Sequence, residues 1–299
     1  MASNIYKEAD KNIFRTWAFM LFFFALVGAI GYFFAYIYQS PGILTIALAF
    51  ALFMNVFAYW FADSIVLKMH HAYPATREAD FDLYTITENL AITAGLPMPK
   101  LYIVEDNAPN AFATGRNKDH AVICVTTGLL AILNKEELEG VVAHEMSHIG
   151  NRDMALGTIV VVLAGFVTLL SHFFLRSMWF GGGRRNSRDN EAGGILMLVG
   201  IVLAILSPII ATLIQLAISR KREFLADADG ALLTRYPQGL ANALQKIAAT
   251  GAPMQTANTA DAHLFIANPF GPNGKTMNFV QKLFMTHPPV EERIKALVG

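Results

Sequence analysis

The sequence predicts a mainly α-helical membrane protein, with four transmembrane helices and a smaller α+β domain that contains a short sheet. Composition is the first reason: 54% of the 299 residues are hydrophobic and only 15% are charged, whereas soluble domains carry about 25% charged residues. The second reason is that the apolar residues gather in four blocks of about 20 to 26 residues, each long enough to cross a hydrocarbon core.

The four blocks form two pairs, and each pair is expected to make a helical hairpin. Only Gln39, Ser40 and Pro41 separate the first two blocks. A second span that follows at once argues against a cleavable signal peptide. Asp63, near the end of the second block, is expected at the membrane interface or inside the helix bundle. The predicted spans cover residues 14–38, 42–67, 156–175 and 195–218.

Lysine and arginine near the spans predict their orientation, because basic residues concentrate on the cytoplasmic side. Three basic residues precede the first span and two follow the second, whereas the loop between these spans has none. The segment after residue 67 is therefore expected in the cytoplasm. Four arginines between the second pair conflict with this, so either the rule fails there or the second hairpin does not fully cross. The residues concerned are Lys7, Lys11, Arg15, Lys68 and Arg77, and in the conflicting loop Arg176, Arg184, Arg185 and Arg188.

The two polar stretches, residues 68–155 and 219–299, differ in their patterns. In the first, a helix is predicted over residues 76–94, closed by Gly95 and Pro97. The second is expected to be helical with breaks at its proline and glycine clusters. Strands are predicted, from alternating or continuous apolar residues, over 100–104, 107–115 and 121–126.

A helix predicted over residues 134–150 carries the most informative motif, the His-Glu-x-x-His pattern of His144, Glu145 and His148. Residues four apart share one face of an α-helix, so both imidazoles can bind one zinc ion. Glu145 lies about 100° further round, where it reaches the attacking water. Asn134 and Glu137 form a capping-box pattern at the helix start, which argues against two unrelated surface histidines.

A catalytic zinc usually has a third protein ligand, and the helical stretch at residues 219–229 offers one. Glu223 and Asp227 are again four apart on one face. Glu223 would complete a site of two histidines and one glutamate for one Zn²⁺ per chain, and Asp227 would accept the N–H of a ligand imidazole. Taken alone, this spacing is equally typical of a surface helix with Arg–Glu pairs. Beside the histidine motif, the ligand role is favoured.

Because the histidines and Glu223 come from different polar stretches, the two stretches are expected to form one zinc metalloprotease domain of about 170 residues. The predicted organisation is a transmembrane hairpin at 1–67, a first catalytic part with the histidine motif at 68–155, an inserted second hairpin at 156–218, and a second catalytic part with the third ligand at 219–299.

This combination of motifs resembles the HtpX family of bacterial membrane zinc endopeptidases, which are relatives of the CAAX prenyl endoproteases. The resemblance rests on the spans, residues 110–115, the histidine motif, the Ser-Arg-x-x-Glu-x-x-Ala-Asp pattern that begins at Ser219, and Thr-His-Pro-Pro at residues 286–289. It implies a gluzincin-like fold, zinc ligands His144, His148 and Glu223, and Glu145 as general base. It also implies quality control of misfolded or damaged membrane proteins under stress, in the bacterial cytoplasmic (inner) membrane, with the active site facing the cytoplasm.

Two further features are expected to act on the substrate. The backbone of Asn110, Ala111, Phe112 and Ala113 is a candidate edge strand for pairing with an extended peptide. The Asn110 side chain would add a hydrogen bond to the peptide or, equally, satisfy its own turn.

The charge that develops in the tetrahedral intermediate needs a hydrogen-bond donor. His287, oriented by Arg293, is the candidate, and the equal alternative is a histidine that precedes a helix, with Arg293 in a surface ion pair. His263 is expected to be an ordinary surface or loop residue.

Other functional classes are poorly supported by the sequence. The formal net charge is +0 and no basic stripe, Walker loop or dinucleotide motif is present, so protein substrates and a lipid bilayer are the expected partners, without nucleic acid or nucleotide. The one cysteine, Cys124, excludes an intrachain disulfide and is expected to be buried. The alternative to a protease is a non-catalytic zinc-binding membrane scaffold, but a structural zinc site needs no base such as Glu145. A transporter is disfavoured because the spans carry few charges.

Overall fold

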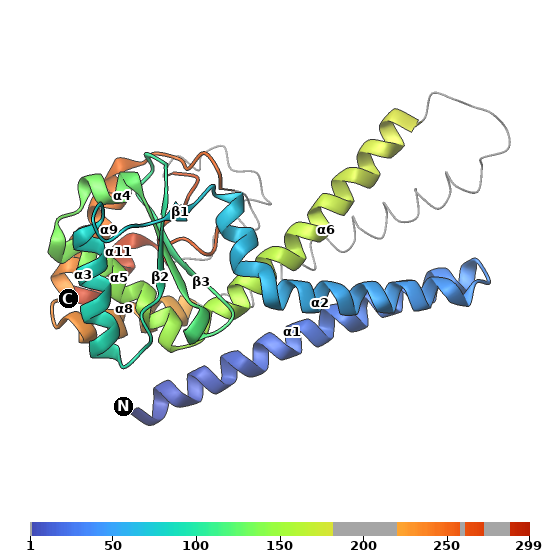
Figure 1. The fold of residues 1–299 in the computed structure, drawn as a ribbon, viewed down its shortest axis with the longest axis horizontal. Coiled ribbons are helices and arrows are strands. Elements are labelled where there is room, and N and C mark those ends of the chain that lie inside the picture. The colour runs from blue at the N-terminus through green and yellow to red at the C-terminus, as the bar shows by residue number, and fades with distance from the viewer. Residues whose placement is uncertain (1, 182–219, 258–260, 272–287) are drawn as a thin grey trace.

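Long helices extend from one side of a mixed α/β domain in the computed structural model of the chain (Figure 1). The structure describes residues 2–181, 220–257, 261–271 and 288–299. Two predicted features, the span at residues 195–218 and His287, lie outside these residues.

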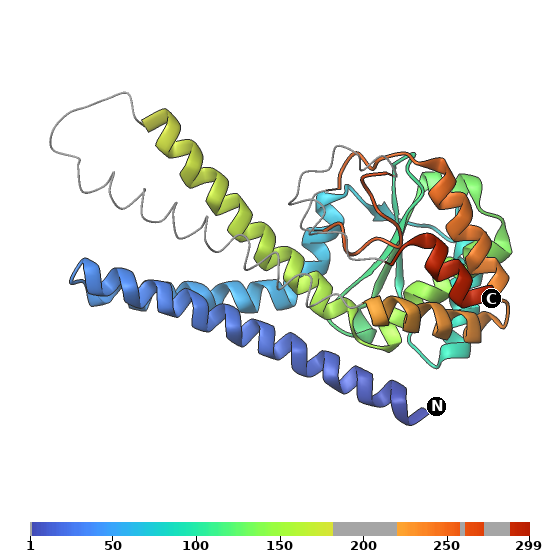
Figure 2. The ribbon, with the colours of Figure 1, turned by 180° about the vertical axis from the view of Figure 1, so that it is seen from behind.

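Helices α1 (Ala2–Ile37) and α2 (Pro41–Met69) form the predicted N-terminal hairpin, and they lie side by side in both views (Figure 1, Figure 2). Gln39 has a φ of 49° in the turn and Pro41 begins α2, so the chain reverses within three residues. Both helices are long and apolar enough to cross a membrane. Their outward faces carry exposed apolar side chains such as Leu21 and Ile46, as expected of surfaces that contact lipid tails.

Helix α6 (Met154–Gly181) contains the third predicted span. Its first turns are buried because Ile159, Val160 and Leu163 pack against α1 and α2. Lys135–Gly150 and Met154–Val167, the part of α6 whose side chains the structure describes, are long and apolar enough to cross a membrane only as a pair, which is bent by 83°. The part of the chain that the structure describes thus holds two helices that could cross a membrane, or three if the bent pair is one broken span.

The sheet has four strands in the order β1-β2-β4-β3. They are β1 (Tyr73–Pro74), β2 (Lys100–Val104), β3 (Ala111–Thr114) and β4 (Val122–Thr126). β2 and β4 are parallel, whereas β1 and β3 run antiparallel to their neighbours. β3 is therefore at one edge of this sheet, and a short 3-10 helix, η1 (Lys118–His120), connects it to β4. Helix α4 (Thr127–Ile132) follows β4 directly.

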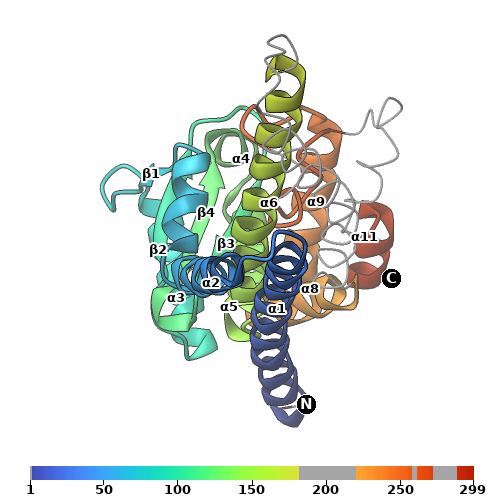
Figure 3. The same ribbon diagram turned by 90° about the vertical axis from the view of Figure 1, so that its right-hand side faces the viewer.

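Helix α5 (Lys135–Gly150) lies in the middle of the domain. The sheet and α3 (Phe81–Ala94) lie on one side of it, and α8 (Arg220–Thr234), α9 (Pro237–Thr250) and α11 (Val290–Val298) lie on the other (Figure 3). Val141, Val142 and Met146 are fully buried. The helix that carries the histidine motif is therefore the central element of the core.

Two predicted boundaries shift for local reasons. The helix expected from residue 76 begins at Phe81, because Asp80 accepts a hydrogen bond from the Thr76 N–H and holds a turn there. The strand expected from residue 107 begins at Ala111, because Asp106 accepts a hydrogen bond from the N–H of Ala108 and forms an Asx-type turn. The predicted stop at Gly95, with a φ of 65°, and the burial of Cys124 are confirmed.

Candidate metal centre

The first turn of α5 is held by a reciprocal capping box. The Asn134 side chain accepts a hydrogen bond from the Glu137 N–H, and the Glu137 carboxylate accepts one from the Asn134 N–H, both at 2.9 Å. Lys246 on α9 pairs with the same carboxylate at 2.7 Å. Because α5 is anchored at its start and buried along its length, its two imidazoles project from a rigid element.

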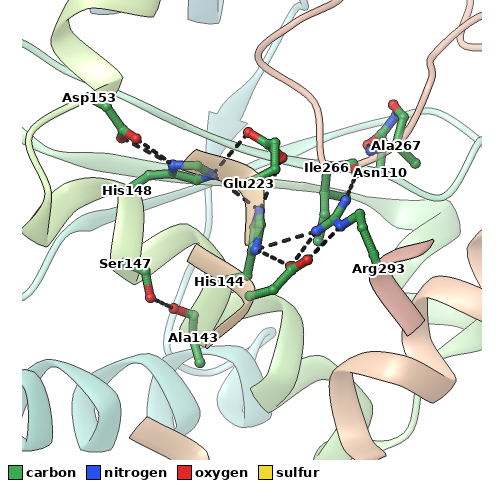
Figure 4. A network of polar contacts seen from close by, with 11 residues as sticks. Asn110, Ala143, His144, Ser147, His148, Asp153, Glu223, Ile266, Ala267 and Arg293 are labelled. Carbon is green, nitrogen blue, oxygen red and sulfur yellow. Dashed lines mark hydrogen bonds and ion pairs between the residues drawn. The ribbon is translucent and has the colours of Figure 1, made fainter. Parts of the chain in front are cut away.

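Three side chains from α5 and α8 converge on one point (Figure 4). The Nε2 atoms of His144 and His148 are 3.1 Å apart, and each lies 3.9 Å from an oxygen of Glu223. Tetrahedral zinc with bonds of about 2.0 to 2.1 Å places neighbouring ligand atoms roughly 3.3 Å apart. The three residues thus fit a single divalent ion with little movement.

Both imidazoles turn the same nitrogen toward the point of convergence. His144 Nδ1 lies 2.9 Å from Asp227, and His148 Nδ1 lies 3.1 Å from Asp153. A carboxylate on Nδ1 assigns the proton to that atom and leaves the Nε2 lone pair for a metal. Two unprotonated Nε2 atoms this close repel each other unless a cation lies between them, so the donor chemistry also fits a metal.

Asp227 on α8 and Arg293 on α11 support His144 (Figure 4). Arg293 donates to both Asp227 oxygens, at 2.8 and 2.6 Å, and the arginine is only 1% exposed. Burial opposes the ionisation of Asp227, but hydrogen bonds from Arg293 and His144 outweigh it and lower the Asp227 pKa to about 2. The carboxylate therefore stays charged and keeps His144 in one tautomer.

Asp153, between α5 and α6, supports His148, and the sequence pattern did not single it out. Both Asp153 oxygens lie 3.1 Å from His148 Nδ1. Burial lowers the pKa of His148, but Asp153, Glu223 and Glu145 outweigh it and raise this pKa to about 10. The surrounding carboxylates thus favour positive charge at the imidazole pair, which a proton or a metal ion can supply.

Glu145 points into the same site with one oxygen unsatisfied. The residue is 1% exposed, and its Oε2 has no hydrogen-bond partner among the described residues. Burial is the main cause that raises the Glu145 pKa to about 7, while His148 and a hydrogen bond from the Ala113 backbone oppose the rise. A carboxyl group with a pKa near neutrality can both accept and return a proton.

A cavity opens between these side chains and residues 261–268, a segment that we call the strap. Besides the three converging ligands and Glu145, the cavity is lined by Ala113, Asp153, Met154, Gly157, Arg222, His263, Leu264, Phe265 and Ile266. His263 was expected to be an ordinary surface or loop residue, and it does lie in an irregular segment, but it is buried and lines the cavity. The residue is 6% exposed and its Nε2 lies 3.3 Å from the Gly157 carbonyl.

The strap pairs with part of β3, the strand that was predicted to bind the substrate. Asn110 is 2% exposed and its side-chain amide bonds to both the carbonyl and the N–H of Ala267, so it is used within the chain. The expected hydrogen bond from Asn110 to a peptide is therefore not available in this structure. The Ile266 N–H also donates to the Ala111 carbonyl at 2.9 Å, and beyond this contact Ala113 lines the cavity beside Glu145.

Arg293 has a role different from the expected one. It was expected to orient His287 or to form a surface ion pair. Instead, its buried guanidinium binds Asp227 and donates to the Ile266 carbonyl at 2.8 Å. It therefore links the support of His144 to the strap, while His287 lies outside the described residues.

Comparison with known proteins agrees with this geometry. Residues 77–299 match peptidase family M48. A protein named protease HtpX homolog from Caldanaerobacter subterraneus is 48% identical over 297 residues, which cover 98% of this chain and 97% of the relative. A protein of the same name from Pyrococcus furiosus is 49% identical over 285 residues, which cover 95% and 94%. The one from Streptococcus gordonii is 44% identical over 298 residues, which cover 98% and 99%.

A solved structure shares the fold. The crystal structure of S. mikatae Ste24p matches with a TM-score of 0.51 and 20% sequence identity, and the match covers 98% of this chain and 67% of that chain. At this level of identity the likeness concerns the arrangement of the chain alone.

Proposed function

The chain belongs to peptidase family M48 and is a membrane-bound metalloendopeptidase, and from this premise we propose that it uses one Zn²⁺ ion per chain to hydrolyse misfolded or damaged membrane proteins. One observation carries the proposal. A buried carboxylate, Glu145, has an oxygen without a partner among the described residues, directly beside three converging ligand side chains. A structural metal site has no use for such a group.

Zinc is the ion that this donor set favours. Two imidazoles and one carboxylate are typical ligands of catalytic zinc, whereas Mg²⁺ and Ca²⁺ prefer oxygen ligands. When bound, the ion supplies Lewis acidity and lowers the pKa of a water to about 7.

The chain's own residues supply the remaining roles. His144, His148 and Glu223 hold the ion, and Asp227 and Asp153 fix the two imidazole rings. Glu145 takes the proton of the attacking water and returns it to the leaving nitrogen. The peptide pairs with the open edge of β3 at Ala113, which brings its carbonyl next to Glu145.

The proposed location is the bacterial cytoplasmic membrane, with the site on the cytoplasmic side. Basic residues in the first turns of α1 and around the end of α2 support this orientation, because such residues stay in the cytoplasm. The proposed role in quality control rests on the resemblance to HtpX-like proteases and on a site held next to membrane helices.

The experiment is a cleavage assay with matched variants. The wild-type protein and Glu145→Gln are purified in detergent without metal, loaded with Zn²⁺ and incubated with casein. We expect Glu145→Gln to bind the same amount of zinc but to cleave about 100-fold to 10,000-fold more slowly, since general-base catalysis contributes that much.

The alternative, a zinc-binding scaffold without activity, makes the opposite prediction. Equal turnover by the two proteins, or none by either when zinc is bound, would reject the peptidase mechanism. Reconstitution with Mg²⁺ or Ca²⁺ in place of Zn²⁺ tests the identity of the ion, and full activity with either would exclude zinc as the required metal.

A further inference from the structure

The strap lies along the edge of β3 in the way that an added strand does. Phe265 forms an antiparallel bridge with Phe112, and the Ile266 N–H donates to the Ala111 carbonyl at 2.9 Å. A peptide that binds to the edge of a sheet makes main-chain contacts of the same kind. The strap therefore occupies the edge that a peptide substrate needs.

Two side chains bind the main chain of the strap at the next residues (Figure 4). The Asn110 amide donates to the Ala267 carbonyl at 3.1 Å and accepts from the Ala267 N–H at 3.3 Å. Arg293 donates to the Ile266 carbonyl at 2.8 Å. Every residue of a peptide other than proline offers the same N–H and C=O groups. These bonds thus hold an extended chain without reading its side chains, and the bond that Asn110 was expected to give to a peptide is given to the strap.

The side chains of the strap fill two apolar sites. The Phe265 ring is fully buried, with its centroid 5.3 Å from those of Phe112 and His70. Ile266 is 1% exposed and packs in the core cluster that also contains Ala111. Successive residues of an extended chain point to opposite faces, so the two side chains enter different sites. Uncovering these sites costs free energy unless other apolar groups fill them.

The strap is also a wall of the cavity that contains the converging ligands. Phe265 and Ile266 line this cavity together with Glu145. A peptide that took the place of the strap on β3 would therefore lie directly beside the proposed general base. Both the backbone contacts and the position correspond to those of a bound substrate.

We propose that the strap is a built-in pseudosubstrate, and that the enzyme selects substrates in which an aromatic residue is followed directly by a branched aliphatic one, as Phe265 is followed by Ile266. The proposal rests on the peptidase function above and adds the substrate class. A polar peptide can replace the backbone bonds of the strap but leaves both apolar sites uncovered. Folded proteins bury such apolar pairs, so the strap yields to unfolded segments.

Asp261 fastens the first residue of the strap. Its Oδ2 lies 3.3 Å from His70 Nε2, and both side chains are fully buried. Neither residue is among the described residues that line the metal cavity. A change at Asp261 can therefore loosen the strap without removing a group from the cavity.

The first test compares casein cleavage by full-length, zinc-loaded wild type and Asp261→Asn in detergent. We expect the KM of the variant to fall about 3-fold to 10-fold at unchanged kcat, because a larger fraction of the molecules has an open edge. Asp80→Asn is the control, since its carboxylate holds a turn before α3, and its KM should equal that of the wild type. An unchanged or higher KM in Asp261→Asn would mean that the strap is a fixed wall, which overturns the proposal.

The second test does not depend on that variant and needs no turnover. Amide hydrogen exchange of residues 263–267 is measured in full-length, zinc-loaded Glu145→Gln, with and without the peptide acetyl-Ser-Gln-Leu-Phe-Ile-Ser. We expect the peptide to accelerate exchange at least ~5-fold, because it releases the Ile266 N–H from Ala111. A control peptide has serine and threonine in place of phenylalanine and isoleucine, and it should change nothing. Unchanged or slower exchange with the apolar peptide, or equal acceleration by both peptides, would overturn the proposal.

Casein cleavage by the zinc-loaded wild type is measured in parallel, because it tests the peptidase function separately. The apolar peptide should compete with casein at a concentration at least ~10-fold lower than the control peptide. If casein is cut and neither peptide affects the strap, only this inference fails. If casein is not cut, the peptidase function itself fails.

Discussion

The two histidines of the candidate metal centre are held by supports of opposite kinds. His144 rests on Asp227 and Arg293, which come from α8 and α11 and are at most 2% exposed. His148 rests on Asp153, only five residues further along the chain, and its own side chain is 18% exposed. One side of the centre therefore depends on assembly of the whole domain, whereas the other is built locally.

The difference has energetic consequences. Removing one partner from a buried ion pair leaves an uncompensated charge and costs about 3 to 5 kcal/mol. Replacing a carboxylate that orients a metal ligand mainly lowers the affinity for the metal. The His144 side should thus respond to substitution in stability and the His148 side in metal binding.

The largest expected effect comes from Glu223, the ligand shared by the two sides. Glu223→Ala should abolish stoichiometric zinc binding and reduce casein cleavage to background, because two imidazoles alone leave the site one ligand short. Zinc content after gel filtration measures this. Glu136→Ala, on the first turn of α5, is the control, and an unchanged zinc content in Glu223→Ala would place the third ligand elsewhere.

Arg293→Met should have the next largest effect. It leaves Asp227 charged and buried without its partner, and we expect a loss of about 3 to 5 kcal/mol in the free energy of unfolding. Denaturant unfolding of the metal-free protein measures the loss. The double variant Arg293→Met with Asp227→Asn should recover part of the stability but not the zinc affinity. If Arg293→Met were as stable as the wild type, the His144 and His148 sides of the metal centre would not differ in the way described.

Asp153→Asn should have a smaller and different effect. The amide keeps the size of the side chain but removes the charge that orients His148, and we expect zinc affinity to fall about 10-fold to 100-fold with little change in unfolding. Competition with a metal chelator gives the affinity. Asp119→Asn, on the exposed η1 helix, serves as the matched control. If Asp153→Asn lost as much stability as Arg293→Met, the His148 side would not be held locally.

The smallest effect is expected where α1 contacts the His148 side. The Asn12 amide donates to the Asn151 carbonyl at the end of α5, and the Asn151 amide donates to Asp229 on α8. Asn12→Ala removes one buried hydrogen bond and should cost about 1 kcal/mol. Thermal unfolding in detergent would detect the shift. An unchanged midpoint would mean that α1 adds nothing to this side of the centre.

The contrast also explains what the sequence could predict. The spacing of His144 and His148 and the capping box of Asn134 and Glu137 are local patterns, and the structure contains both the helix and the cap. Asp153 could have been found by the same logic, since a carboxylate one turn beyond a ligand histidine can return to its ring.

Arg293 and the strap could not be predicted in this way. The contact between Arg293 and His144 joins residues 149 apart and depends on how α11 packs. The pairing of Phe265 with Phe112 is a single bridge in an irregular segment without strand alternation. No short-range pattern records such contacts, because they are products of tertiary packing.

The position of Arg293 along the chain has a consequence for synthesis. The ribosome makes His144 first and Arg293 149 residues later, a delay of roughly 7 to 30 seconds at ~5 to 20 residues per second. Throughout that interval, the nascent chain carries the histidine helix without the arginine that balances Asp227. The chain therefore acquires the complete support of its metal centre only after Arg293 has been translated, long after the histidine helix itself.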